Sequence, residues 1–142
     1  MLIRFLRDLE IEIWHAMRRK LWPDPPPELE EAERLRAKPS YLIWVAEQDG
    51  HVIAFLEAQT CNRADGCVSD SILYIEGWFV EEPFRHQGIG SVLMQTAEEW
   101  AHAHNILELG SDALLDNTIS HRAHAKLGFH EVDRQISYAK KL

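Results

Sequence analysis

Apolar residues recur at helical spacing near the start of the chain. From about residue 6 to residue 21 they occupy every third or fourth position, which is typical of a helix with one buried face. The members of this stripe are Leu6, Leu9, Ile13, Met17 and Leu21. Trp22 and Pro23 end the predicted helix, because proline cannot continue the hydrogen-bond ladder. A second, acidic helix is predicted from Glu28 to Lys38, before Pro39.

The next stretch favours strands. Tyr41 to Glu47 and His51 to Thr60 are predicted to be strands, joined by Asp49-Gly50. That dipeptide is typical of a two-residue hairpin turn. Residues 61 to 70 are polar and rich in turn-forming residues, so a loop is expected there.

Residues 72 to 80 are almost wholly apolar, as expected of a buried strand. Gly77 interrupts this strand, which indicates a bulge or a place where something lies against the backbone. A turn containing Gly88 and Gly90 follows and opens a helix. The apolar face of that helix comprises Ile89, Val92, Leu93, Ala97, Trp100 and Ala101.

Three further elements complete the predicted fold. Ile106 to Leu109 reads as a short buried strand that ends at Gly110-Ser111-Asp112. A helix is predicted from Asn117 to Leu127, with Gly128 in the position that commonly follows a helix end. Phe129 to Lys140 is predicted to be the final strand. Helices that alternate with strands in this way indicate an α/β or α+β domain around a mixed sheet.

The length of 142 residues suits one domain with its own core, so residues 1 to 142 are predicted to be a single domain. No apolar run approaches the roughly 20 residues that span a bilayer. The first residues carry charges too early for a signal peptide. Cys61 and Cys67 have neither the pattern of a disulfide framework nor the spacing of a zinc site. A reduced, cytoplasmic compartment is therefore expected.

The formal net charge of −8 argues against a nucleic-acid partner, because nucleic acid is bound by basic surfaces. The same charge is compatible with a cationic small-molecule partner. Two histidine pairs, His102/His104 and His121/His124, are candidates for a metal site. No carboxylate or cysteine completes either pair, so no metal site is predicted.

The glycine turn has the chemistry of a phosphate site. A helix that starts at a glycine turn exposes several backbone N–H groups at the positive end of its dipole. The turn reads Arg85-x-x-Gly88-x-Gly90 and lacks the Gly-Lys-Ser/Thr of a nucleotide P-loop. Leu93 also stands where a dinucleotide fingerprint that starts at Gly88 would have its third glycine or alanine. Taken alone, the turn is compatible with a simple helix entry.

Together with later residues, this turn resembles a known superfamily. Arg85-x-x-Gly88-x-Gly90 resembles the pyrophosphate signature of the GCN5-related N-acetyltransferases (GNAT). Asn117, followed ten residues later by Leu127-Gly128-Phe129, resembles their closing motif. Further motifs resemble the aminoglycoside 6′-N-acetyltransferases, and the resemblance extends from Leu9 to Tyr138. These motifs are Leu21-Trp22-Pro23, Glu76-Gly77-x-Phe79-Val80, Ser111-Asp112 and Asn117-Thr118-Ile119-Ser120.

The resemblance implies the GNAT fold, a mixed central sheet splayed between two strands and flanked by helices. It implies an enzyme that moves the acetyl group of acetyl-CoA to the 6′-amino group of an aminoglycoside, by direct attack in a ternary complex, and so confers resistance. It also implies a homodimer in which the strand around Asp133 to Tyr138 is exchanged or paired between subunits. The residues implied to hold acetyl-CoA are Trp78, Phe79, Val80, Arg85, His86, Gln87, Gly88, Ile89, Gly90, Ser91 and Asn117. Asn117 also suits a helix N-cap.

Two carboxylates are candidates for binding the amine and accepting its proton. An alkylamine with a pKa near 10.4 is neutral in only about one molecule in a few thousand at pH 7, so a nearby carboxylate assists attack. Glu76 lies within an apolar strand and Asp112 follows the neighbouring strand. The resemblance adds Trp22 and Asp133 as acceptor contacts. His124, three residues before Leu127, is a candidate acid for the leaving thiolate or a packing residue.

Two other functions are compatible with this sequence. The acceptor could be a polyamine or another small metabolic amine, or the domain could be a catalytically idle acyl-CoA-binding module. Glu76 and Asp112 argue against a catalytically idle module, because binding of the cofactor alone requires neither carboxylate. Further acids would either make the acceptor cleft acidic or form a solvated face. These are Glu28, Glu31, Glu57 and Asp65.

Overall fold

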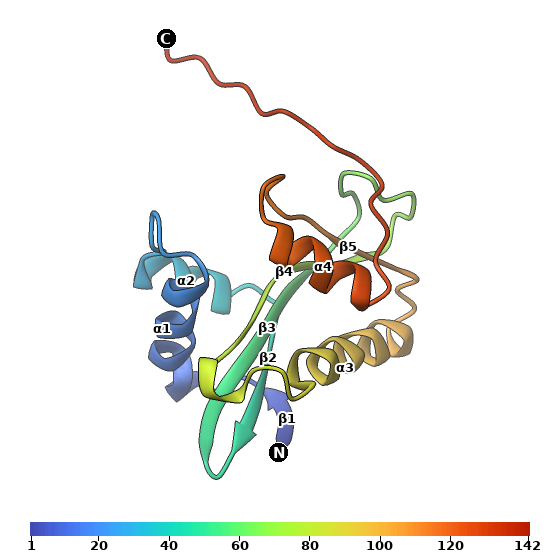
Figure 1. The fold of residues 1–142 in the computed structure, drawn as a ribbon. Coiled ribbons are helices and arrows are strands. Elements are labelled where there is room, and N and C mark those ends of the chain that lie inside the picture. Colours follow the sequence, from blue (N-terminus) through green and yellow to red (C-terminus); the bar gives the residue numbers. More distant parts are fainter.

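The computed structural model describes residues 1–142 and contains one five-stranded sheet in the order β1-β2-β3-β4-β5. The strands are β1 (Leu2–Phe5), β2 (Tyr41–Gln48), β3 (His51–Cys61), β4 (Ile72–Val80) and β5 (Glu108–Ser111). The first four strands pair antiparallel, and β5 pairs parallel to β4. The predicted mixed sheet is therefore confirmed (Figure 1).

Four α-helices and two short 3-10 helices surround this sheet. They are η1 (Asp8–Glu10), α1 (Ile11–Leu21), α2 (Leu29–Arg36), η2 (Glu82–Phe84), α3 (Ile89–Ala103) and α4 (Thr118–Lys126). Helices α1 and α2 lie on one face of the sheet and α3 on the other (Figure 1). No helix of the chain combines the length and the apolar character needed to cross a bilayer.

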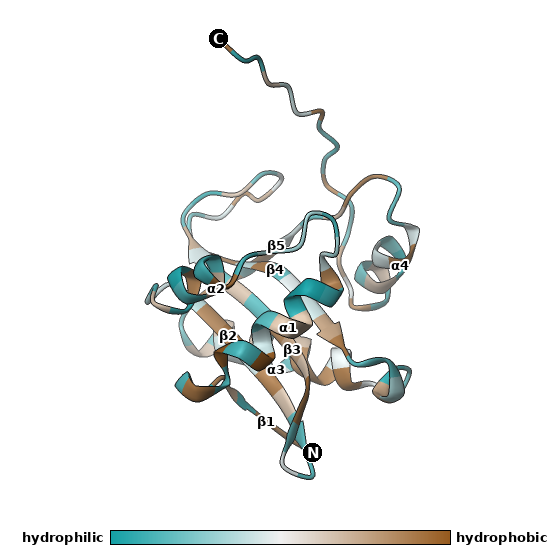
Figure 2. Cartoon of the chain, turned by 90° about the vertical axis from the view of Figure 1, so that its left-hand side faces the viewer, coloured by the Kyte–Doolittle hydropathy of each residue, from teal (hydrophilic) through white to brown (hydrophobic).

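Alternating side chains of the strands build a separate core on each face of the sheet. Ile43 and Val45 of β2 pack against Trp14 and Met17 of α1. The intervening residues of β2 pack under α3, in a cluster that includes Leu93. In Figure 2, which views the sheet from the side of α1 and α2, hydrophilic turns of these helices face outward and hydrophobic stretches of the strands lie behind them.

The hairpin and the central strand are confirmed. β2 and β3 are joined by Asp49 and Gly50, both with positive φ (52° and 77°), as a type I′ turn requires. β4 occupies Ile72–Val80, the apolar stretch that predicted it.

The amino-terminal prediction was wrong in two respects. Leu2–Phe5 forms an edge strand that the sequence reading missed, and the helix begins at Ile11 rather than near residue 6. The backbone N–H of Leu6 donates to the Ile43 carbonyl at 2.9 Å, so this residue continues the extended edge. Leu9 is 98% exposed. Extended and helical segments happen to follow each other here with apolar residues at helix-like spacing.

The carboxyl-terminal prediction needs two corrections. β5 begins at Glu108, two residues after the predicted start, and the intervening Leu107 is 82% exposed. Residues 129 to 140, predicted as a strand, form no regular element; Phe129 packs against the core, and the end of the chain leaves the body of the molecule (Figure 1). A strand needs a partner for its N–H and C=O groups, and no strand of this chain pairs with the segment.

Candidate functional site

A β-bulge lies at Glu76 in the middle of β4. Glu57 of β3 pairs with Gly77, but Ala58 pairs with Ile75, so Glu76 is the extra residue. A bulge of this kind bends the strand and redirects a side chain. The interruption predicted from Gly77 is confirmed, and it presents a carboxylate in a strand that is otherwise apolar.

The sheet opens beside this bulge. β4 pairs with β5 only from Ile72 to Ile75, and the last of these pairs joins Ile75 to Ser111. Beyond that point β4 continues from Glu76 to Val80 with no strand on that side. The backbone groups of Trp78 to Val80 therefore lie at a split between two parallel strands.

Trp22 covers the bulge from the α1 side. A Cβ atom added to Gly77 would lie 2.8 Å from two ring carbons of Trp22 and 3.0 Å from a methyl carbon of Leu21. Real Cβ atoms do not approach other atoms so closely, and the indole cannot bend away as a flexible chain would. Glycine at position 77 therefore lets the indole lie directly against the strand.

The Glu76 carboxylate lies half-buried at the split. Its Oε1 accepts a hydrogen bond from Gln59 Nε2 at 2.8 Å. Burial raises the pKa of Glu76; the Gln59 bond opposes this rise, the Asp112 charge adds to it, and the Arg18 charge opposes it. A carboxylate whose pKa is raised is a better proton acceptor once it is ionised.

Asp112 is exposed just after β5 and is tied to β4. The Tyr74 hydroxyl donates to Asp112 Oδ2 at 2.6 Å. Burial, followed by the bond to Asp112 and its charge, raises the pKa of Tyr74, so the phenol stays protonated and keeps donating. The two candidate acids, Glu76 and Asp112, are thereby brought to the same split.

The turn before α3 offers a row of backbone donors. No N–H group from His86 to Ser91 donates a hydrogen bond within the chain, and the first that does is Val92, to the Gly88 carbonyl at 3.1 Å. His86 and Gly88 have positive φ (62° and 81°), which shapes the turn. Free N–H groups at a helix N-terminus form an anion site.

Arg85 does not extend freely from this turn. Its Nε donates to the Val80 carbonyl at 2.8 Å, and its guanidinium carbon lies 5.3 Å from the centre of the Phe79 ring. This side chain therefore fastens the turn to the end of β4.

The predicted N-cap role of Asn117 is confirmed, since its Oδ1 accepts from the Ser120 N–H at 3.1 Å. His124 lies at the end of β5, where Nε2 is 2.8 Å from Ser111 Oγ and Nδ1 is 2.8 Å from the Ser120 carbonyl. Because a carbonyl only accepts, Nδ1 carries the proton of that bond. The imidazole also meets the Trp78 ring edge-on, with centroids 4.8 Å apart.

Asp133 is not brought to the other candidates within one chain. It lies in the exposed segment after α4, and its carboxylate accepts from the N–H of Arg134. Its Cβ would be 3.8 Å from a Cβ at Gly66, in the loop before β4. No contact joins it to Glu76 or Asp112, because the segment that carries it forms no strand in this chain.

The sequence reading missed a buried acid beneath the bulge. Glu57 was expected to line the cleft or to be solvated, but its exposure is 0%. Its carboxylate accepts from Trp14 Nε1 at 2.8 Å, from the Tyr41 hydroxyl at 2.7 Å and from Arg18 Nε at 3.1 Å. The signal was present, because Glu57 lies within an apolar strand as Glu76 does.

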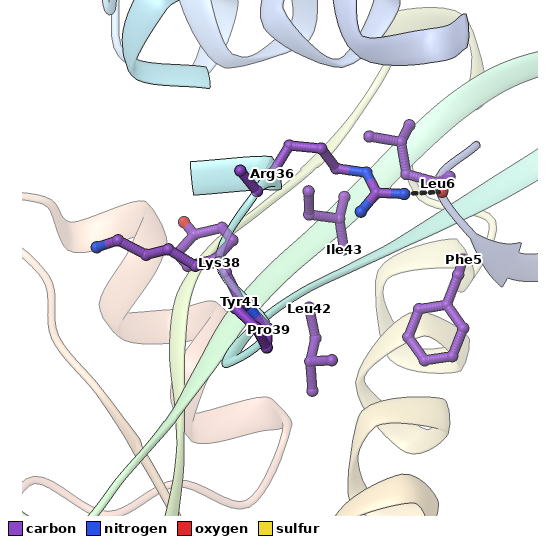
Figure 3. A pocket seen from close by; sticks show the side chains of 9 residues that line it. Phe5, Leu6, Arg36, Lys38, Pro39, Tyr41, Leu42 and Ile43 are labelled. Carbon is purple, nitrogen blue, oxygen red and sulfur yellow. Dashed lines mark hydrogen bonds between the residues drawn. The ribbon is translucent and has the colours of Figure 1, made fainter. Parts of the chain in front are cut away.

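A separate hollow of about 350 Å³ lies between β1, the end of α2 and the start of β2 (Figure 3). Its charged lining residues are Arg36 and Lys38. The Arg36 guanidinium is bound to the Leu6 carbonyl at 3.2 Å (Figure 3). This hollow holds none of the predicted site residues and supplies no proton acceptor.

Comparisons with known proteins agree with this geometry. The family model described as acetyltransferase (GNAT) family matches residues 4–129. The chain is 32% identical to aminoglycoside N(6′)-acetyltransferase type 1 of Salmonella enteritidis, over 98% of each chain. Among solved structures, aminoglycoside 6′-N-acetyltransferase AAC(6′)-IG from Acinetobacter haemolyticus superposes with a TM-score of 0.91 at 31% identity, over 100% of this chain and 99% of that one. AAC(6′)-Iy in complex with the bisubstrate analogue CoA-S-monomethyl-acetylneamine gives a TM-score of 0.88 at 31% identity, over 99% and 98%.

Proposed function

Because the chain belongs to the GNAT acetyltransferase family, we propose that it moves the acetyl group of acetyl-CoA to the 6′-amino group of an aminoglycoside. The amine attacks the thioester directly in a ternary complex, and the product no longer carries that cation. Acetylation of the antibiotic in this way confers resistance. The relatives' names and the bisubstrate complex of AAC(6′)-Iy support this choice of substrates.

Acetyl-CoA would occupy the split and the turn. The N–H groups of His86 to Ser91 are free to bind the pyrophosphate, with Gln87, Ile89 and Gly90 inside that row. The unpaired edge of β4 at Trp78, Phe79 and Val80 would hold the pantetheine and polarise the thioester carbonyl. The Asn117 amide nitrogen remains available to the pantetheine, since only its oxygen caps α4.

The acceptor amine would lie between Glu76, Asp112 and Trp22. Two carboxylates bind a polycation, and Glu76 then accepts the proton released as nitrogen attacks. His124 would return a proton to the leaving thiolate. Nδ1 donates to the Ser120 carbonyl, so this role requires a second proton on Nε2, which lies 2.8 Å from Ser111 Oγ.

The bulge carries this proposal, because it places the Glu76 carboxylate at the split between β4 and β5. An idle CoA-binding module would have no use for it. The test measures release of the CoA thiol from acetyl-CoA in the presence of each acceptor from a panel of aminoglycosides, polyamines and peptide amines. The panel includes aminoglycosides that carry an amino or a hydroxyl group at position 6′ and are otherwise alike.

We expect turnover with the 6′-amino compound and none at that position with its 6′-hydroxyl counterpart. Mass spectrometry of the product should show one added acetyl group. Turnover of polyamines alone would instead establish the metabolic-amine function. If CoA binds but no amine in the panel causes thiol release, the domain is a catalytically idle CoA-binding module.

We also propose that the protein is a homodimer in which residues 133 to 138 of each subunit pair with the other subunit. The cytoplasmic location of the protein stays a prediction. The outer edge of β5 has no strand partner. A hollow of about 500 Å³ runs beside that edge, lined by Leu109, Leu127 and Phe129 among others. Ile136 and Tyr138 alternate along the exposed segment and are 77% and 90% exposed. A strand with one apolar face suits such an edge.

Light scattering at micromolar concentration should therefore give twice the chain mass of 16.5 kDa. Ile136→Lys should shift the mass toward the monomer, because it places a charge on the face that is buried on pairing. Gln135→Lys is the matched control, since adjacent residues of a strand point to opposite sides. A monomeric wild type would refute the dimer, and equal masses for wild type and Ile136→Lys would refute this mode of pairing.

A further inference from the structure

An arginine and a glutamate are the charged side chains buried in this chain, and they pair with each other. Arg18 is 4% exposed and Glu57 is 0% exposed. Arg18 Nε lies 3.1 Å and 3.2 Å from the two carboxylate oxygens. The chemistry proposed above uses neither residue.

This ion pair lies directly under the bulge. Glu57 is paired with Gly77, and the register shifts at the next residue of β3. Burial raises the pKa of Glu76, the bulged residue, and the Arg18 charge opposes that rise as a minor contribution. The pair therefore acts on the strand that forms one wall of the site.

The arginine also holds the aromatic wall. Its guanidinium carbon lies 5.1 Å from the ring centres of both Trp14 and Trp22. Positions 14, 18 and 22 are spaced by four residues and so follow one stripe of α1 and its end. The six-membered ring of the Trp22 indole lies against the backbone at Gly77, where an added Cβ would be 2.8 Å from two of its carbons. Trp22 thus lies next to both the Arg18 guanidinium and the bulged strand.

Stability alone does not account for such a pair. Replacement of a buried ion pair by apolar groups is often neutral or stabilising, because desolvation offsets the Coulombic attraction. Arg18 Nη1 is buried and makes no hydrogen bond, and Glu31 Oε2 lies 3.6 Å from it. The guanidinium is therefore oriented by Glu57 and the two indoles at the expense of one of its own donors.

We propose that Arg18 is a positioning residue for the acceptor site: anchored by Glu57, its guanidinium fixes the Trp22 indole against the Gly77 bulge and so sets the wall that the acceptor amine meets. This proposal rests on the proposed acetyl transfer and adds a residue that contacts neither substrate. It makes Arg18 a determinant of acceptor recognition, with no part in CoA binding.

The test compares Arg18→Met, the double variant Arg18→Met/Glu57→Gln and the control Arg4→Met. Arg18→Met alone leaves a buried, unpaired carboxylate and is expected to lower Tm. The double variant removes both charges, so it should regain most of that stability. Arg4 pairs with Glu10 and Glu47 near β1 and has a side chain only 14% exposed. It matches Arg18 as a paired arginine outside the site.

In the double variant we expect the acceptor KM to rise about tenfold, the scale of one lost cation–π contact, while calorimetric CoA affinity stays within about twofold. Arg4→Met should lower Tm and leave both constants unchanged. An acceptor KM within about twofold of wild type in a stable double variant would overturn the proposal. So would an equal rise in Arg4→Met.

A second readout does not depend on the substrate. With 5-fluorotryptophan incorporated, the ¹⁹F resonance of Trp22, assigned through Trp22→Phe, should shift and sharpen in the double variant as the ring gains mobility. An unchanged Trp22 resonance would overturn the positioning role whatever the acceptor is. Failure of wild type to acetylate any aminoglycoside would contradict the proposed function, and the spectrum would still decide the role of Arg18.

Discussion

Replacement of Glu76 by Gln should lower kcat/KM for an aminoglycoside by about 100-fold or more, the usual scale of positioned acid–base help. The substitution keeps the shape of the side chain and removes its charge and its basicity. CoA affinity, measured by calorimetry, should stay unchanged, because the turn from His86 to Ser91 lies outside the bulge. The fold should persist, since a glutamine can still accept from Gln59.

The pH profile gives the same residue a second test. Burial raises the pKa of Glu76, and the base must be ionised to accept a proton. For wild type, kcat/KM should therefore fall as the pH drops through that raised pKa. Glu76→Gln should lose this acid limb along with the activity.

Two matched variants isolate the effect. Glu47→Gln changes a partly exposed carboxylate that is paired with Arg4, outside the site, and should keep full activity. Asp112→Asn should also lower kcat/KM, with a larger share in the acceptor KM, because Asp112 is exposed and suited to binding the cation. Equal kcat/KM in wild type, Glu76→Gln and Asp112→Asn for every amine would remove both acids from the mechanism.

Gly88→Glu should weaken CoA binding by about 100-fold. A side chain at φ +81° is strained, which costs about 1–2 kcal/mol for a residue other than glycine. The turn would relax from the conformation that aligns its N–H groups, and the new carboxylate would repel the pyrophosphate by about 1 kcal/mol. The sum of about 2–3 kcal/mol corresponds to this loss of affinity.

Two variants separate the causes. Gly88→Asn tolerates positive φ and adds no charge, so it should keep most of the affinity. Gly50→Glu introduces a glutamate at φ +77° into the β2–β3 hairpin, with nothing within 4 Å of its Cβ, and should leave CoA binding intact. Unchanged calorimetric affinity in Gly88→Glu would show that this turn does not hold the pyrophosphate.

Local signals in the sequence sufficed for much of the fold. The β2–β3 hairpin follows from Asp49-Gly50, since few dipeptides accept two successive positive φ angles. β4 follows from an unbroken apolar run, and the bulge from the one glycine inside it. α4 follows from an Asn cap and from Gly128 beyond its end. Each of these features depends on residues that are neighbours in the chain.

Such local signals could not predict the edge strand β1 or the conformation of the final segment. β1 is a short edge strand whose existence depends on pairing with β2 some forty residues later. Residues 129 to 140 have a strand-like pattern and no strand partner in this chain. Strand formation depends on where a partner lies, and local periodicity carries no information about that.

The candidate site also has features that the sequence alone indicated and features that only the tertiary structure decided. The sequence by itself determined that Glu76 and the turn from His86 to Ser91 are unusual, because an acid in an apolar strand and a glycine-bearing helix start are both local departures. Only the tertiary structure decided that Glu57 is buried, that Arg18 reaches it across 39 residues and that Trp22 lies on Gly77. These contacts join α1 to the centre of the sheet, and burial and pairing of a charge are set by what packs around it in space.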